Sequence, residues 1–208
     1  MALKSATANI DLNALVNNFA FIKKTAPNSK VLAVLKANAY GHGLERIANA
    51  LTEADAFGVA RIDEALALRA SGVVKPIVLL EGFFDADELQ VIDRLDLDTG
   101  IHSFHQLQQL LDSQLSRPIN VWLKLDTGMH RLGFLQQQFR QAYQQLRNSN
   151  KVAEMVLLSH FARADETRCD ATREQIALFN AATTDMTEAV SLSNSPGILA
   201  WPEANGDW

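Results

Sequence analysis

The sequence contains a single cysteine, Cys169, among its 208 residues. One cysteine excludes an internal disulfide framework and a zinc site built from several thiolates. A chain so poor in cysteine is typical of a reducing compartment, so a cytoplasmic protein is expected. No metal ion is expected.

The chain also lacks a surplus of positive charge. Its 19 Lys and Arg residues are outnumbered by 24 Asp and Glu, for a net charge of −5, and they are scattered along the sequence. No nucleic-acid partner is expected, because neutralising phosphates requires clustered Lys and Arg.

Long apolar runs are absent as well. None approaches the ~20 residues that a membrane span requires. Residues 1–10 lack the apolar core of a signal peptide. Neither membrane attachment nor secretion is therefore expected.

What the sequence does contain is an alternation of short apolar segments with amphipathic ones. Residues 31–35 are continuously apolar, as in a strand buried on both faces of a parallel sheet. Leu44, Ile47, Ala48 and Leu51 then recur with the spacing of an amphipathic helix. Further strands are predicted at 56–60, 76–80, 97–101, 119–125, 155–158 and 190–193. The helices between them are predicted to begin near residues 62, 85, 103, 134 and 172.

This alternation predicts an α/β fold with a parallel sheet. An open doubly wound sheet is disfavoured because no G-x-G-x-x-G follows the first strand, and Gly41-His42-Gly43 lacks the third glycine. A (β/α)8 TIM-type barrel typically needs about 250 residues. With seven predicted strands, the barrel would be one strand short. No linker divides the chain, so residues 1–208 are interpreted as one domain.

Reactive side chains directly follow several predicted strands. They are Lys36 after the first strand, Lys124 at the end of the fifth with Arg131 in its loop, His160 after the sixth, and Asn194 and Ser195 after the seventh. In a parallel barrel the carboxyl ends of all strands lie on one face, where active sites are built. These residues are therefore predicted to converge.

Lys36 allows two interpretations. Most lysines are solvated surface residues. A lysine in a desolvated, cationic setting can instead form a Schiff base. Gly41 and Gly43, which permit close approach of the backbone to a ligand, favour the second interpretation, as does the hydroxyl of Tyr40.

Residues 33–43, Ala-Val-Leu-Lys-Ala-Asn-Ala-Tyr-Gly-His-Gly, resemble the pyridoxal phosphate (PLP) attachment motif of alanine racemases. Segments 123–133, 159–166 and 193–195 are similar to further blocks of that family, in the same order, so the resemblance covers essentially the whole chain. It implies a PLP-binding (β/α)8 barrel, followed in the family by a C-terminal β-domain and assembled as a homodimer. The implied activity is the interconversion of L-alanine and D-alanine, which supplies D-alanine for peptidoglycan.

The resemblance also implies roles for individual residues. Lys36 would carry PLP as a Schiff base and act as the base on one face of the substrate Cα. Tyr40, Asn194 and Ser195 would contact the cofactor, with Tyr40 and Ser195 at its phosphate. Arg131 would lie near the phenolic oxygen of PLP and the substrate carboxylate, where a guanidinium suits an anion. From residues alone, a plain turn is the preferred interpretation of Asn194 and Ser195, because these residues and the following Pro196 and Gly197 are all turn formers.

Two further residues have alternative interpretations. By resemblance, His160 belongs to the cofactor and catalytic set and would hydrogen-bond the base on the opposite face, although a lone histidine after a strand is more often structural. Lys124 matches a position that is carbamylated in many family members. The alternative is an unmodified lysine paired with Asp126, and the sequence leaves both open.

The sequence also departs from the family pattern. It stops at Trp208, before the arginine that would face the pyridine nitrogen, the last strand, the β-domain and the opposite tyrosine. Its tyrosines are Tyr40 and Tyr143, and Tyr143 lies in a helical pattern typical of packing. The barrel is therefore expected to be incomplete at its C-terminal end, with two unpaired edges. These 208 residues are expected to bind PLP weakly or not at all and to racemise alanine poorly.

Two alternative functions remain open. One is a PLP-binding module of the same barrel type that does not racemise, as in the short PLP-homeostasis proteins, whose lysine motif differs. The other is a broad-specificity amino-acid racemase, a class that usually carries a secretion signal.

Overall fold

The computed structural model describes residues 7–208. Residues 1–6, on which the expected absence of a signal peptide partly rests, lie outside the described residues. Among residues 7–208, no helix is both long and apolar enough to cross a bilayer.

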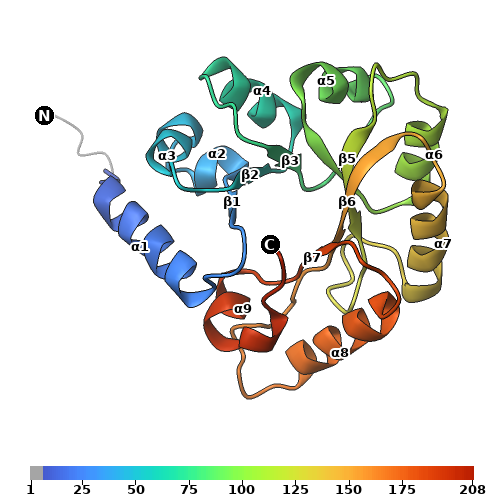
Figure 1. Ribbon diagram of the computed structural model, residues 1–208. Helices are drawn as coiled ribbons and strands as arrows, with labels where there is room; N and C mark the ends of the chain where they lie inside the picture. Colours follow the sequence, from blue (N-terminus) through green and yellow to red (C-terminus); the bar gives the residue numbers. More distant parts are fainter. Residues whose placement is uncertain (1–6) are drawn as a thin grey trace, which may run out of the picture.

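Within residues 7–208, seven parallel strands form one curled sheet, and each strand is hydrogen-bonded to its neighbours in sequence (Figure 1). They are β1 (Leu32–Val34), β2 (Ala56–Val59), β3 (Ile77–Leu79), β4 (Asp98–Ile101), β5 (Ile119–Lys124), β6 (Val152–Leu158) and β7 (Ala189–Ser191). All seven overlap strands predicted from the sequence. The clearest are β2 and β3, which are buried along their whole length and contain no polar side chain. The predicted incomplete parallel barrel is confirmed.

The helices surround the outer face of this sheet (Figure 1). They are α1 (Leu12–Thr25), α2 (Lys36–Tyr40), α3 (Leu44–Ala50), α4 (Ile62–Ala70), α5 (Glu88–Leu95), α6 (Phe104–Asp112), α7 (Gln136–Arg147), α8 (Ala171–Thr183) and α9 (Ser195–Ala200), followed by the 3-10 turn η1 (Pro202–Ala204). The main core lies between sheet and helices, and Tyr143 packs into it as expected, at 9% exposure.

Four helices differ from the predictions, since α1, α2 and α9 were not predicted and α5 begins later than expected. α5 begins at Glu88 rather than near Asp85, because residues 85–87 form turns that end in a bond from Glu88 N to Asp85 O (3.1 Å). The Glu88 carboxylate accepts from Phe84 N (2.8 Å), so it caps the turns rather than the helix. α1 was not predicted, although Leu12, Leu15 and Phe19 recur with helical spacing and pack, partly buried, against the core.

A second, smaller cluster fills the inside of the barrel. Val78, Trp122 and Leu158 are its buried members. The ring of Trp208 meets that of Trp122 edge-on, with centroids 5.2 Å apart. These side chains pack the inside of the barrel around Trp122.

Residues 205–208 lie between the two end strands, β1 and β7 (Figure 1). Trp208 N donates to Val190 O on β7 (3.1 Å), and Lys30 N, just before β1, donates to Asp207 O (2.8 Å). The Asp207 carboxylate accepts from Val190 N (2.8 Å). The side of the barrel expected to be unpaired is thus bridged here by main-chain hydrogen bonds.

The opposite rim, at the amino ends of the strands, is held by cations that donate to carbonyl groups. The guanidinium of Arg69 in α4 donates to Val73 O (2.9 Å) and Lys75 O (2.7 Å), which precede β3. It also donates to Leu95 O (3.0 Å) and Asp96 O (2.8 Å), which precede β4. One side chain therefore connects two helix-to-strand loops.

Candidate active site

The turn after β1 presents Lys36. It is labelled α2, but its backbone is left-handed, with φ between 52° and 55° from Ala37 to Tyr40. For residues other than glycine, this conformation costs roughly 1–2 kcal/mol each. Backbone strain of this kind is concentrated at functional sites.

Hydrogen bonds from neighbouring elements hold this turn. The Asn38 side chain accepts from Leu44 N (2.8 Å), and Asn38 N donates to the Glu64 carboxylate (3.3 Å). Gly43 N donates to Asn38 O (3.0 Å). Gly41 and Gly43 have φ of 85° and 98°, so they end the turn in backbone conformations that favour glycine.

The loop after β5 carries Arg131. Its first turn is built on Asp126, whose carboxylate accepts from Gly128 N (2.9 Å) and His130 N (3.0 Å). Asp126 therefore bonds within its own loop and forms no ion pair with Lys124 among the described residues. Lys124 itself is 9% exposed at the end of β5.

The loops after β6 and β7 supply the remaining predicted residues. His160 follows β6 and is half-buried. The Asn194 side chain accepts from Gly197 N (3.0 Å) and so caps α9, while Ser195 is exposed at the start of that helix. The side-chain oxygen of Asn194 therefore has the structural role that the plain-turn interpretation predicted.

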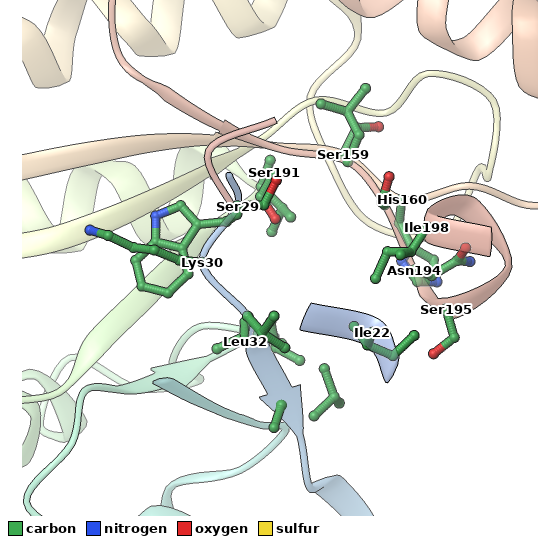
Figure 2. A pocket seen from close by; sticks show the side chains of 18 of the residues that line it. Ile22, Ser29, Lys30, Leu32, Ser159, His160, Ser191, Asn194, Ser195 and Ile198 are labelled. Carbon is green, nitrogen blue, oxygen red and sulfur yellow. The ribbon is translucent and has the colours of Figure 1, made fainter. Parts of the chain in front are cut away.

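One cavity of about 760 Å³ extends from the carboxyl ends of the strands along the side of the barrel between β1 and β7, as far as Ser29, Lys30 and Trp208. It is lined by all seven residues singled out in the sequence, which are Lys36, Tyr40, Lys124, Arg131, His160, Asn194 and Ser195. In Figure 2, His160, Asn194 and Ser195 lie on one side of the view and Lys30 on the other. The volume is in the range of small-molecule sites.

Positive charge dominates this cavity. None of the ion pairs between described residues involves Lys36, Lys124 or Arg131. Burial, followed by repulsion from Arg131 and Lys36, lowers the pKa of Lys124 to about 8. A site with several cations that lack acidic partners suits a ligand bearing phosphate or carboxylate groups.

The same charges act on His160. Burial, then repulsion from Lys124, Arg131 and Lys36, lowers its pKa to about 4. Its imidazole is therefore neutral near pH 7.

Among the charged residues of the cavity wall, sequence reasoning missed Lys30 and Glu81. Glu81 comes two residues after β3, on the same rim as Lys36 and His160, so the rule that selected those two residues could have found it. The main-chain oxygen of Glu81 contacts His102 Nε2 (3.0 Å). Residues 7–208 contain no group of three His, Cys, Asp or Glu side chains placed to hold a metal ion.

The comparisons with known proteins agree with this arrangement. The family model described as "Alanine racemase, N-terminal domain" matches residues 10–208. The chain belongs to this family. The alanine racemase of Pseudomonas taetrolens is 52% identical over 99% of the chain, and the biosynthetic alanine racemase of Escherichia coli (strain K12) is 47% identical over the same share.

Solved alanine racemase structures have the same fold. The biosynthetic alanine racemase of Pseudomonas aeruginosa superposes on 96% of this chain with a TM-score of 0.92 and 42% identity. That of Acinetobacter baumannii covers 95% with a TM-score of 0.88 and 36% identity. The chain spans 58% of the length of the two curated relatives and 56% of each of these two structures.

Proposed function

We propose that this chain carries the PLP-binding, Lys36 side of an alanine racemase active site, in an isomerase that interconverts L-alanine and D-alanine. The observation that carries the proposal is the cavity lined by Lys36, Lys124 and Arg131, in which none of the three cations has an ion-pair partner among the described residues. Family membership and relatives named alanine racemase support it.

The residues present fit PLP, which combines an aldehyde with a phosphate and a phenolic oxygen. A primary amine suits the aldehyde, and fixed cations suit the two anionic groups. When bound, PLP withdraws electrons from the substrate Cα and so stabilises the charge left by proton removal. Tyr40, Asn194 and Ser195, on the cavity wall, are proposed to contact the cofactor.

In this proposal the chain's own side chains bind the substrate and move its proton. The amine of Lys36 removes a proton from Cα on one face, or returns it there. Arg131 attracts the substrate carboxylate and the phenolic oxygen. Racemisation requires a second proton-transferring group on the opposite face, which we propose comes from a second subunit of a homodimer.

Lys124 and His160 would adjust the charge and the hydrogen bonding of the residues that bind the substrate and move its proton. With a pKa of about 8, Lys124 has a substantial neutral fraction at mildly alkaline pH. A neutral amine can react with CO2 to form a carbamate, whose negative charge would hold the guanidinium of Arg131. His160, neutral near pH 7, can hydrogen-bond a base without adding charge.

The whole-protein setting is also proposed. Residues 1–208 would form the PLP-binding barrel domain of a longer polypeptide that has a C-terminal β-domain, resides in the cytoplasm and supplies D-alanine for peptidoglycan. Relatives named biosynthetic and relatives named catabolic both match, so either metabolic direction is compatible with the proposal.

The test is borohydride reduction of the full-length gene product mixed with PLP, followed by peptide mapping. A label on Lys36 that is lost in Lys36→Arg and kept in Lys24→Ala, an exposed position on α1, is expected. A label confined to another lysine would overturn the cofactor assignment. Chiral analysis of alanine, incubated with the full-length product of the gene, then distinguishes a racemase from a PLP-binding protein that does not racemise.

A further inference from the structure

A buried glutamine on α8 connects the two loops that carry Arg131 and His160. Gln175 is 3% exposed. Its amide nitrogen donates to Thr127 Oγ1 (2.9 Å) and to the main-chain oxygen of His160 (3.1 Å). Its amide oxygen accepts from Ala162 N (3.0 Å). Both hydrogens and the oxygen of this side chain are therefore used.

A hydrogen bond between two hydroxyl groups links the same two loops directly. Thr127 Oγ1 lies 2.8 Å from Ser159 Oγ, and both hydroxyls are buried. Gly128 adopts φ of 138°, and a Cβ built there would lie 3.4 Å from Gln175 Cγ. The first turn of the Arg131 loop thus rests on Gln175, while the same amide holds the main chain at His160.

We propose that Gln175 is a positioning residue for the reaction proposed above, because it fixes the main chain at His160 and the Arg131 loop in one arrangement. Gln175 is not among the residues that line the cavity, so it acts through other residues. The inference rests on the proposed function for its kinetic consequence, whereas its geometric part can be tested without cofactor or substrate.

The geometric consequence concerns the charges around the imidazole. His160 is half-buried beside Lys124 on β5, Arg131 in the following loop and Lys36 after β1, and these three cations disfavour its protonation. If the Gln175 amide is lost, the His160 loop and the Arg131 loop can move apart. The imidazole then gains water and leaves the cations, and both changes favour protonation.

The experiment compares Gln175→Met with a matched control, Gln106→Met. Methionine has nearly the same length and lacks all three hydrogen bonds. Gln106 is also buried, at 4% exposure, and it bonds Glu81 O, Phe83 O and His102 N in the same three-bond pattern. Both variants remove an equivalent buried network, so they are expected to lose similar stability.

Two readouts separate positioning from packing. In NMR titrations of the histidine rings without PLP, the pKa of His160 is expected to rise by about one unit or more in Gln175→Met and to stay at its wild-type value in Gln106→Met. In the full-length gene product, kcat for alanine is expected to fall about tenfold to a hundredfold in Gln175→Met, with a smaller change in KM.

Wild-type His160 titration together with wild-type kcat in a folded Gln175→Met would overturn the proposal. If that variant does not fold, Thr127→Val, which removes one partner of the amide, replaces it, and an unchanged titration there is equally decisive. Failure of the wild-type gene product to racemise alanine would contradict the proposed function alone, because the titration still reports on Gln175.

Discussion

At the scale of single residues, the left-handed turn beside Lys36 leads to a prediction about stability. Ala37 is exposed and has φ of 54°, a conformation that glycine adopts freely. Ala37→Gly is expected to leave the free energy of unfolding unchanged or to raise it by up to about 1 kcal/mol, because relief of strain offsets the added backbone entropy. Urea denaturation measures this.

Ala20 provides the control, since it is exposed in the middle of the right-handed helix α1. Ala20→Gly is expected to lower the free energy of unfolding by about 1 kcal/mol, the usual difference between the two residues in a helix. Equal losses in the two variants would show that the turn beside Lys36 stores no strain.

His160 gives the protein a specific sensitivity to acid. Its pKa is about 4 in the folded state, against the 6.5 that is usual for a solvated histidine. Between pH 4 and pH 6.5 the unfolded chain binds more protons than the folded protein. The free energy of unfolding therefore rises as the pH increases through this range, and His160 adds no further increase above pH 6.5. With a discount for partial exposure, this contribution is about 2 kcal/mol.

His160→Asn should remove that part of the pH dependence, as measured by urea denaturation at intervals across the same range. His105→Asn, at an exposed position on α6, should keep the wild-type slope. A wild-type slope in His160→Asn would contradict the assignment of this acid sensitivity to His160.

Lys124 is expected to form a carbamate, because its lowered pKa makes the neutral amine available in a cationic site. Carbon-13 NMR with labelled bicarbonate should give a carbamate signal that strengthens as the pH rises toward 8. The signal should disappear in Lys124→Met and persist in Lys151→Met, because Lys151 bonds a carbonyl on the opposite rim. If both variants keep the signal, the modification is on another residue.

At the scale of elements, the loops at the amino ends of the strands depend on Arg69. Arg69→Met removes a side chain that satisfies four carbonyl groups. The variant is expected to lose about 2–3 kcal/mol of unfolding free energy, since carbonyls left without partners in a partly buried site are costly. Arg46→Met, at an exposed position on α3, should lose less than about 0.5 kcal/mol. Similar losses would show that the four bonds are dispensable.

The sequence predicted the strands well, and physics explains why. A strand such as β5 is buried on both faces, so its hydrophobic pattern is nearly continuous and its end is marked by the charge of Lys124. The convergence of Lys36, Lys124, Arg131 and His160 also followed from the sequence, because it depends only on the parallel arrangement of strands.

Other features could not be predicted from local pattern. The left-handed backbone of the turn from Ala37 contradicts the intrinsic preference of alanine. The turn is held through Asn38, which accepts from Leu44 N and donates to the Glu64 carboxylate. Gln175 lies 48 residues from Thr127, and a glutamine within a helix carries no sequence signal of such a contact. Interactions between distant segments decide both.

At the scale of the whole molecule, the open side of the barrel depends on residues 205–208. The Trp208 ring contacts Trp122 inside the barrel and lies under the Lys30 ammonium, 4.9 Å from the ring centroid. Trp208→Ala is expected to lower the free energy of unfolding by about 2 kcal/mol and to speed amide hydrogen exchange at Lys30. Phe84→Ala, at an exposed aromatic residue before α5, should not speed exchange at Lys30. Wild-type exchange at Lys30 in Trp208→Ala would contradict this bridging role.

The sheet order also constrains how the chain folds. Each strand pairs with the strand next to it in sequence, so every such pair can form by closing only the one helix-containing connection between the two strands. The bond from Ser29 Oγ to Gly206 O joins residues 177 positions apart. Loop closure becomes entropically more costly as the loop lengthens, and distant contacts slow folding. In refolding experiments, the β2–β5 strands should gain protection first, and the junction between Ser29 and Gly206 should form last.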